Sequence, residues 1–381
     1  MRVTMLNKYY PPHLGGIEYH LRDLATELAA RGHEVRALVA NEGRATVRET
    51  VDGVSVTRLG RAFAYASTPV VPGMSRAIAA EAARADAPDV FHLHFPYPWG
   101  EVSWLRSGVS GSTAGAVTVL TYHSDIVRQK AMLALYEPFL RRLLDRVDLV
   151  IASSPNMVEH SPYLSRVADK CRVVPFGIHV ERFAPTPERE VRATELRAGH
   201  DRPVVLFVGR LVYYKGVEVL VRAMARVDAD LVLIGRGPLR ADLESLASSL
   251  GIGHRVRFVE PVGDDDLAAW YRAADVFCLP SVARSEAFGL VQLEAHASGT
   301  PVVSTELTTG VPFVNENGVS GLTVPPHDVE ALAEALDALV RDDSLRLRLG
   351  AQAAERARRE FSIGTMVERT LGVYADARGD A

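Results

Sequence analysis

The chain has 381 residues, of which 48% are hydrophobic and 24% are charged, and its formal net charge is −4 at pH 7. At roughly 100–200 residues per domain, this length predicts two globular domains. A small negative charge provides no basic field that would attract nucleic acid, so we expect no nucleic-acid partner.

The sequence predicts a cytoplasmic protein. The N-terminal residues MRVTMLNKYYPP lack the uninterrupted apolar core of a signal peptide, and no apolar run reaches the ~20 residues that cross a bilayer. Cys171 and Cys278 lie far apart in apolar contexts, which is typical of reduced thiols.

The first forty residues predict a β-α-β unit. A strand at Arg2–Asn7 is followed by a loop with Gly15 and Gly16, and a helix from about Ile17 has leucines at three- and four-residue spacing. Nearly unbroken apolar runs are typical of a parallel sheet that helices cover on both faces. The further strands that we expect here are Glu34–Ala40, Val90–Leu93, Val117–Thr121 and Leu149–Ala152, with a helix near Arg128–Arg146.

A second strand-helix series follows the proline-containing segment 183–188, which predicts a linker. The fold class is therefore α/β, with two Rossmann-like, doubly wound parallel-sheet domains facing a cleft. We expect the domains at residues 1–183 and 184–360, with a helix at about 361–381 packing back on the first. The strands expected in the second domain are Val204–Val208, Leu231–Ile234, Val256–Val259, Val276–Leu279 and Pro301–Ser304, with tail helices near Asp328–Val340, Ser344–Arg359 and Ile363–Ala377.

Two glutamates enclose an expected anion site in the segment 281–299. Glu286 and Glu294 are predicted on the first turns of one helix, where an eight-residue step advances ~12 Å along the axis. The backbone N–H groups of Phe288, Gly289 and Leu290 would lie between them at the helix start, which suits a phosphate. The alternative is an amphipathic helix with two solvated glutamates.

Two cations follow the first strand of the second domain, in the segment 209–216. Arg210 and Lys215 leave the carboxyl end of strand Val204–Val208. Fixed cations aimed at a diphosphate leaving group stabilise the transition state more than the ground state. The alternative is a pair of solvated surface cations.

Taken together, these motifs resemble glycosyltransferase family 4, whose members are retaining, metal-independent enzymes of GT-B architecture. The resemblance rests on Arg210 with Lys215-Gly216, on Glu286 and Glu294 around Phe288-Gly289, and on Gly15-Gly16. It implies that the C-terminal domain binds the nucleotide sugar and that the N-terminal domain binds the acceptor. It also implies that Arg210 and Lys215 bind the donor diphosphate, that Glu286 binds hydroxyls of the transferred sugar, and that Glu294 binds the ribose.

The resemblance implies further contacts to the donor. Gly15 and Gly16 would let donor and acceptor approach the backbone, although a plain tight turn explains them equally. His123, after a strand, matches a histidine that hydrogen-bonds the donor sugar, and Val262 lies in the turn that would read the base. Arg236 would reach the base or phosphate, against the alternative of a solvated loop cation. The residues expected to be catalytic are His123, Arg210, Lys215 and Glu286, and those expected to bind donor are Gly15, Gly16, Arg210, Lys215, Arg236, Val262, Glu286, Phe288, Gly289, Leu290 and Glu294.

Three other patterns resemble metal or membrane sites. Asp264–Asp266 is similar to an acidic metal motif, but a helix follows at once, which favours helix capping. His92 and His94 share a strand face without a third ligand nearby in the sequence, so we interpret them as cleft lining. The segment Arg128–Arg146 mixes leucines with arginines and leaves open either a surface helix or a helix on an anionic membrane.

We therefore expect a hexosyltransferase that acts in cell-surface polysaccharide or glycoconjugate synthesis. Segments 122–130, 154–157 and 281–289 look similar to bacterial mannosyltransferases of O-antigens and exopolysaccharides, so GDP-mannose is the first expected donor and a UDP-hexose the second. The acceptor would be a saccharide or a lipid-linked saccharide, and we expect no metal or other cofactor. Peripheral contact of the protein with the inner face of the plasma membrane is left open. The alternatives are a UDP-hexose transferase with a small-molecule or lipid acceptor, a sugar-nucleotide epimerase, a glucan synthase, a sugar-binding protein and a dehydrogenase. The dehydrogenase is disfavoured because the first turn reads Pro-Pro-His-Leu-Gly-Gly instead of the three-glycine fingerprint.

Overall fold

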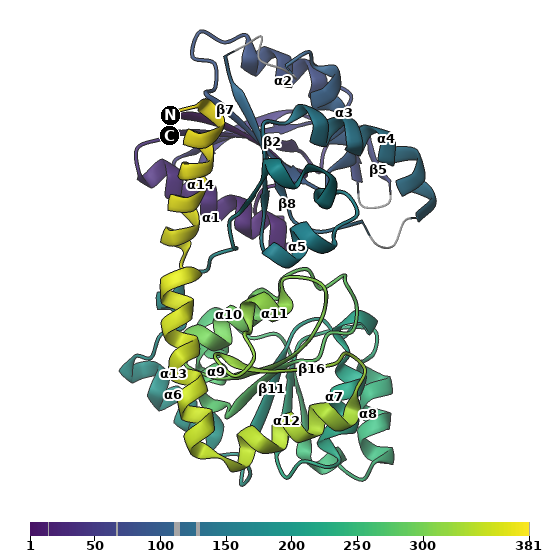
Figure 1. The fold of residues 1–381 in the computed structure, drawn as a ribbon, viewed down its shortest axis with the longest axis vertical. Helices are drawn as coiled ribbons and strands as arrows, with labels where there is room; N and C mark the ends of the chain where they lie inside the picture. Colours follow the sequence, from purple (N-terminus) through teal and green to yellow (C-terminus); the bar gives the residue numbers. More distant parts are fainter. Residues whose placement is uncertain (14, 66–67, 110–114, 127–129, 381) are drawn as a thin grey trace. The chain divides into compact units, whose positions relative to one another are not determined.

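A computed structural model describes residues 1–13, 15–65, 68–109, 115–126 and 130–380 of the chain (Figure 1). The chain folds into two compact units, one of Met1–Phe176 with Ile363–Ala381 and one of Gly177–Ser362. The division comes before the segment 183–188 that we expected to be a linker. Helix α6 (Pro187–Arg197) begins inside that segment, where the side chain of Thr186 accepts a hydrogen bond of 3.3 Å from the backbone N–H of Arg189.

The first unit contains an eight-stranded sheet in the order β10-β9-β8-β7-β1-β2-β4-β3. All neighbouring strands are parallel except β3 and β4. The strand order reverses between β1 and β7, and in a doubly wound sheet ligands bind outside the carboxyl ends of the strands at such a point. The strands are β1 (Arg2–Leu6), β2 (Glu34–Ala40), β3 (Val47–Val51), β4 (Val54–Leu59), β7 (Val90–Phe95), β8 (Val117–Tyr122), β9 (Leu149–Ala152) and β10 (Cys171–Val173), besides a hairpin of β5 (Phe63–Tyr65) and β6 (Thr68–Val70).

The C-terminal helix, α14 (Ile363–Arg378), belongs to the first unit because its apolar face joins that core. Met366, Val367 and Tyr374 are buried in one cluster with Leu21 and Leu24 of the first helix. Helix α14 thus completes the cover of the first sheet from the far end of the chain (Figure 1). The other helices of this unit are α1 (Gly16–Ala30), α2 (Met74–Ala82), α3 (Pro98–Arg106), α4 (Lys130–Arg146) and α5 (Pro155–His160).

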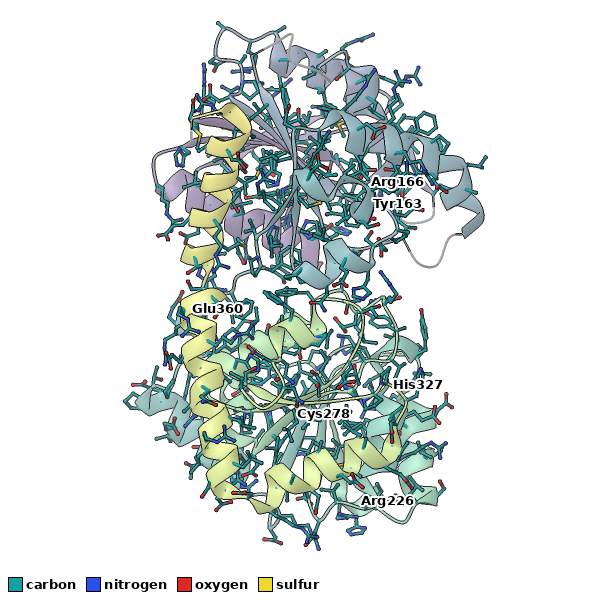
Figure 2. All side chains as sticks on the ribbon, in the orientation of Figure 1. Tyr163, Arg166, Arg226, Cys278, His327 and Glu360 are labelled. Carbon is teal, nitrogen blue, oxygen red and sulfur yellow. The ribbon has the colours of Figure 1, made fainter. Side chains whose placement is uncertain are left out.

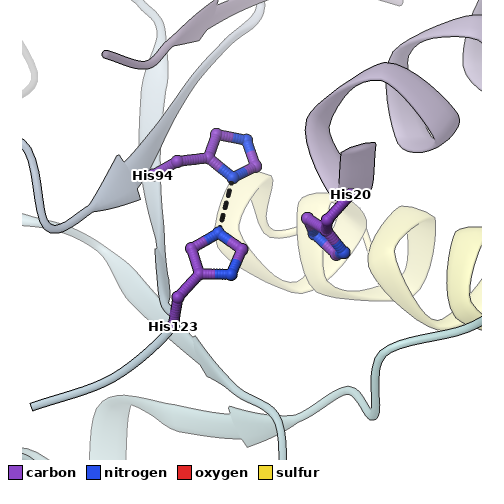
Figure 3. A group of neighbouring side chains, drawn as sticks. All are labelled: His20, His94 and His123. Atoms are coloured by element: carbon purple, nitrogen blue, oxygen red, sulfur yellow. Dashed lines mark hydrogen bonds between the residues drawn. The ribbon is translucent and has the colours of Figure 1, made fainter. Parts of the chain in front are cut away.

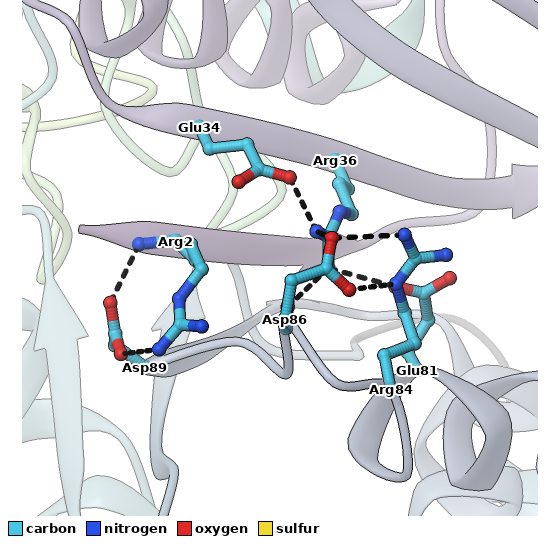
Figure 4. Close-up of polar contacts among 7 residues, drawn as sticks. All are labelled: Arg2, Glu34, Arg36, Glu81, Arg84, Asp86 and Asp89. Atoms are coloured by element: carbon cyan, nitrogen blue, oxygen red, sulfur yellow. Dashed lines mark hydrogen bonds and ion pairs between the residues drawn. The ribbon is translucent and has the colours of Figure 1, made fainter.

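An ion-pair network anchors β1 and β2 to the segment that precedes β7 (Figure 4). Arg36 on β2 pairs with Asp86 at 2.5 Å and donates to its backbone oxygen at 3.0 Å, while Arg2 on β1 pairs with Asp89 at 2.8 Å. The hydrogen bond from Arg84 is the main reason that the pKa of Asp86 falls to about 2. Because the Arg36 side chain is only 10% exposed, this network fixes β1 and β2 more firmly than solvated pairs would.

The second unit contains a six-stranded parallel sheet in the order β13-β12-β11-β14-β15-β16. Counted along the chain this is the order 3-2-1-4-5-6 of a dinucleotide-binding fold, with its reversal between β11 and β14. The strands are β11 (Val204–Val208), β12 (Asp230–Ile234), β13 (Val256–Val259), β14 (Val276–Leu279), β15 (Val302–Thr305) and β16 (Gly321–Val324). The helices are α6, α7 (Val217–Met224), α8 (Arg240–Ser249), α9 (Asp264–Ala273), α10 (Leu290–Ala297), α11 (Val311–Val314), α12 (Val329–Arg341) and α13 (Asp343–Glu360).

Apolar side chains fill both faces of the second sheet. The two faces alternate along β11, because Val205 and Phe207 join one buried cluster and Val204 and Leu206 join another. Cys278 lies fully buried on β14 in the interior of this unit (Figure 2). Two doubly wound α/β units are thus confirmed. Among the described residues, no helix has the length and apolarity needed to cross a membrane.

Candidate functional site

The loop after β11 is held against the loop after β14, at the strand-order reversal of the second unit. Gly216 adopts a left-handed backbone with φ of 65°, and a Cβ there would lie 2.0 Å from the backbone oxygen of Pro280. The backbone N–H of Val282 also donates to the backbone oxygen of Tyr214 at 2.8 Å. Only glycine permits this approach, which brings the neighbouring Lys215 to the carboxyl end of β14.

Lys215 and Glu286 form a buried ion pair at this point. The Lys215 Nζ lies 2.6 Å from Glu286 Oε2, and each side chain is 11% exposed. The Ser281 hydroxyl donates to the same carboxylate oxygen at 3.2 Å. Arg210 is exposed nearby on the β11 loop, where its guanidinium donates to the Tyr214 hydroxyl at 3.1 Å. The structure therefore places both predicted cations and one predicted glutamate at one strand-order reversal.

The expectation that Glu286 lies on a helix is wrong. Helix α10 begins at Leu290, after Gly289 takes a left-handed φ of 76°, so Glu286 lies in the preceding loop. The helical spacing that we assumed between the two glutamates does not apply. The first N–H groups of α10 still follow this loop, and an anion at a helix start is favoured by the helix dipole. The Phe288 side chain is buried, 3% exposed, so only its backbone is available to a ligand there.

Glu294 occupies the second turn of α10 and is paired with a tyrosine that the sequence did not identify. The hydroxyl of Tyr271, on α9, donates to Glu294 Oε2 at 2.7 Å. Burial is the main cause that raises the pKa of Glu294 to about 7. A half-buried carboxylate with one oxygen fixed in this way leaves the other oxygen for a ligand hydroxyl.

Arg236 and Val262 lie after β12 and β13 of the same sheet. The Arg236 guanidinium, 74% exposed, forms an ion pair with Glu260. Arg240 pairs with the other carboxylate oxygen of Glu260 at 2.5 Å. Val262 is half-buried and packs against the core cluster of this unit. Arg236 is thus partnered within the protein.

In the first unit, Gly15 and Gly16 stand at the start of α1, and they differ in the space around them. A Cβ on Gly15 would lie 2.2 Å from Glu18 Oε2, whereas a Cβ on Gly16 would meet nothing within 4 Å. The carboxylate of Glu18 therefore occupies the space that Gly15 leaves, and the open backbone is that of Gly16.

Three histidines from three segments of the first unit gather beside its strand-order reversal (Figure 3). His94 is on β7, His123 follows β8 and His20 is on α1. His94 Nδ1 and His123 Nε2 share a hydrogen bond of 3.1 Å, and the rings of His20 and His123 are 5.0 Å apart. Burial lowers the pKa of His20 to about 4 and those of His94 and His123 well below their usual value. His123 was predicted, whereas His20 and the partnership of His94 were missed because their segments meet only in the fold.

The other patterns have mostly structural roles in the fold. Asp264–Asp266 form the first turn of α9, where their charge suits the helix dipole, although no side-chain cap bond forms. Both ring nitrogens of His92 are hydrogen-bonded: Nδ1 lies 2.7 Å from the Tyr374 hydroxyl and Nε2 lies 2.7 Å from the Thr121 hydroxyl. The expected helix at Arg128–Arg146 is α4, whose side chains are described only from residue 134.

Two sequence profiles cover nearly all of the chain: "Glycosyltransferase Family 4" matches residues 14–182 and "Glycosyl transferases group 1" matches residues 188–356. The chain is 33% identical over 380 residues to O-antigen chain mannosyltransferase C of Escherichia coli, covering 98% of each protein. It belongs to glycosyltransferase family 4. The enzyme is accordingly a hexosyltransferase of GT-B fold.

Solved structures support the fold of this transferase. Sucrose-phosphate synthase from Thermosynechococcus elongatus matches with a TM-score of 0.79 and 26% identity, over 100% of both chains. Anabaena HepE in complex with UDP matches with a TM-score of 0.77 and 19% identity, over 99% of this chain and 100% of that one. At this identity, the likeness to HepE shows a shared fold.

Proposed function

We propose that this enzyme transfers mannose from GDP-mannose to a hydroxyl of a saccharide or lipid-linked saccharide in cell-surface polysaccharide or glycoconjugate synthesis, with retention of anomeric configuration. The observation that carries the donor site is the pair of Lys215 and Glu286 at the reversal between β11 and β14. A cation and a carboxylate side by side match a ligand that carries a diphosphate next to sugar hydroxyls. The mannosyl donor is supported by the relative from Escherichia coli.

In the proposed donor site, Lys215 and Arg210 bind the diphosphate, and Glu286 accepts hydrogen bonds from hydroxyls of the transferred sugar. Lys215 has three N–H donors and uses one on Glu286, so the others remain for phosphate oxygens. Glu294 accepts a hydrogen bond from a ribose hydroxyl at Oε1, the carboxylate oxygen to which Tyr271 does not donate. Backbone groups of the turn at Val262 bind the base. Arg236 binds the base or a phosphate once its ion pair with Glu260 has broken.

The proposed reaction breaks the bond between the anomeric carbon and the diphosphate and forms a bond from that carbon to the acceptor oxygen. The acceptor proton passes to an oxygen of the departing diphosphate. The two cations stabilise the charge that grows on the leaving group, a contribution that requires no metal. His123, whose pKa burial lowers well below the usual value, is neutral and offers hydrogen bonds to the sugar.

A screen of nucleotides tests the donor assignment. Melting curves of the full chain with GDP, UDP, ADP and dTDP should show preferential stabilisation by GDP. Stabilisation by UDP alone would refute GDP-mannose as the donor and favour the alternative, a UDP-hexose transferase acting on a small-molecule or lipid acceptor. Donor turnover without an acceptor would favour the epimerase. NMR of the glycoside product tests retention directly, because an inverted anomeric signal would exclude it.

We further propose that the reaction takes place in the cytoplasm, with α4 in contact with the inner face of the plasma membrane. Leu135 is 79% exposed and Phe139 is 46% exposed on this helix, and Arg141 and Arg142 are exposed beside them. Apolar side chains next to arginines suit the interface of an anionic bilayer. Co-sedimentation with anionic phosphatidylglycerol vesicles should fall in the double variant Leu135→Asp/Phe139→Asp, and equal sedimentation would refute the contact.

A further inference from the structure

Three imidazoles of the first unit converge in a way that the transfer reaction does not require. His20, His94 and His123 each have one ring nitrogen within 4.8 Å of the corresponding nitrogens of the other two. These three nitrogens come from a helix, a strand and a strand end, so a rigid frame holds the cluster. The proposed reaction uses only His123.

We infer that His20, His94 and His123 form a binding site for a divalent late first-row transition ion, with Zn²⁺ as the physiological candidate. Imidazole nitrogen is a preferred ligand of such ions, and three protein ligands with one open position are the usual number at a reactive zinc site.

The geometry of the cluster is close to that of a three-histidine zinc site. Zn–N bonds of about 2.0–2.1 Å at tetrahedral angles place ligand nitrogens ~3.3 Å apart and ring centroids roughly 5 Å apart. His94 Nδ1 and His123 Nε2 are 3.1 Å apart. The ring centroids are 5.0, 5.4 and 5.7 Å apart for the three pairs. An ion would therefore draw the three nitrogens, which lie within 4.8 Å of one another, to a separation of ~3.3 Å.

The three rings are neutral, so each can offer one nitrogen lone pair once its proton stands on the other ring nitrogen. Burial lowers the pKa of all three histidines, so at neutral pH they are neutral imidazoles. The His20 side chain forms no hydrogen bond with any residue that the structure describes. Ligation by His94 Nδ1 and His123 Nε2 moves the proton of their hydrogen bond to the other nitrogen of its own ring, and His94 Nε2 has no partner among the described residues that would prevent this. His92, the neighbour on the same strand face, is excluded as a ligand because both of its nitrogens are hydrogen-bonded.

The surroundings of the cluster limit the access of water to these ligands. The Phe176 ring packs against His20 at 4.8 Å and against His123 at 5.1 Å between centroids. An apolar wall of this kind limits competition from water for the ligand nitrogens. His20 is half-buried rather than enclosed, so an ion can enter from its side of the cluster.

Titration of the chelator-treated full chain with Co²⁺ tests the inference, because tetrahedral cobalt has strong visible absorption. We expect one Co²⁺ per chain, displaced by Zn²⁺. His20→Ala should weaken binding by more than the ~10–100-fold that loss of an outer-shell partner costs. The control His160→Ala removes an exposed histidine of the same unit and should bind like the wild type.

Two results would overturn the site: absence of stoichiometric Co²⁺ binding by the folded wild-type chain, or equal binding by folded His20→Ala. His20 is preferred over fully buried His94 because its replacement endangers the fold less, and circular dichroism checks each variant. If His123 also contacts the donor sugar, which rests on the proposed function, then Zn²⁺ should inhibit transfer. Binding without inhibition would support the ion site and count against that role of His123 alone.

Discussion

Replacing Lys215 by methionine separates the structural and catalytic roles of its ion pair. Lys215→Met keeps the apolar stem and leaves the Glu286 carboxylate, which is 11% exposed, without a counter-charge. Breaking a buried pair costs about 3–5 kcal/mol, and residual exposure favours the lower end, about 3 kcal/mol. At ~2–4 °C per kcal/mol for a unit of this size, the melting temperature should fall by roughly 6–12 °C.

The double variant Lys215→Met/Glu286→Gln should recover most of that stability, because glutamine still accepts the hydrogen bond from Ser281 and carries no charge. Turnover should behave differently. Loss of one preorganised charge donor lowers kcat by about 10²–10³, and the double variant should stay at that level or below. The control Arg226→Met breaks an exposed pair with Glu330 and should change stability by less than about 1 kcal/mol with normal turnover.

Urea denaturation and steady-state kinetics on the same preparations provide both measurements. Recovery of turnover in the double variant would show that the pair is purely structural and would refute the role of Lys215 at the leaving group. A single variant as stable as the wild type would refute the electrostatic argument itself.

Three further outcomes follow from buried carboxylates and from the leaving-group cations. Burial raises the pKa of Glu294 to about 7, so the affinity for GDP measured by calorimetry should rise as the pH increases through 7. Glu294→Gln should bind GDP more weakly and without this pH dependence, and an unchanged affinity would exclude Glu294 from the ribose site. Burial raises the pKa of Glu101 to about 8, above its value of 4.5 in the unfolded chain, so ionisation opposes folding. The free energy of unfolding of the wild type, relative to that of Glu101→Gln, should therefore fall by up to about 1.4 kcal/mol per pH unit from pH 4.5 to about 8 and level off above that. Urea denaturation that gives the same pH dependence for both proteins would contradict this. Transfer should persist in excess EDTA, and a loss that Mg²⁺ or Mn²⁺ restores would show that the cations do not replace a metal.

Local patterns in the sequence determined most of the parallel strands and the fold class. Strands β2, β9, β11, β13 and β14 begin and end at the residues expected. Four of them are mostly buried and read as short apolar runs between turn residues, whereas the half-buried edge strand β13 keeps apolar residues at three of its four positions. The edge strand β3, its neighbour β4 and the hairpin β5–β6 were missed, since their exposed faces dilute that signal. The sequence also pointed to Arg210 and Lys215 after β11 and to Glu286 and Glu294 after β14, because they lie in the segments that follow these buried strands.

Only the tertiary structure decided which of these groups touch. Whether Glu286 lies on a helix or in a loop depends on the left-handed turn at Gly289, and its partnership with Lys215 depends on the packing of two loops around Gly216. The tyrosine at Glu294 and the three-histidine cluster unite residues separated by 23 to 103 positions, so no local pattern records them. Proximity across such separations is set by strand order and helix packing, which satisfy the burial of the whole core at once.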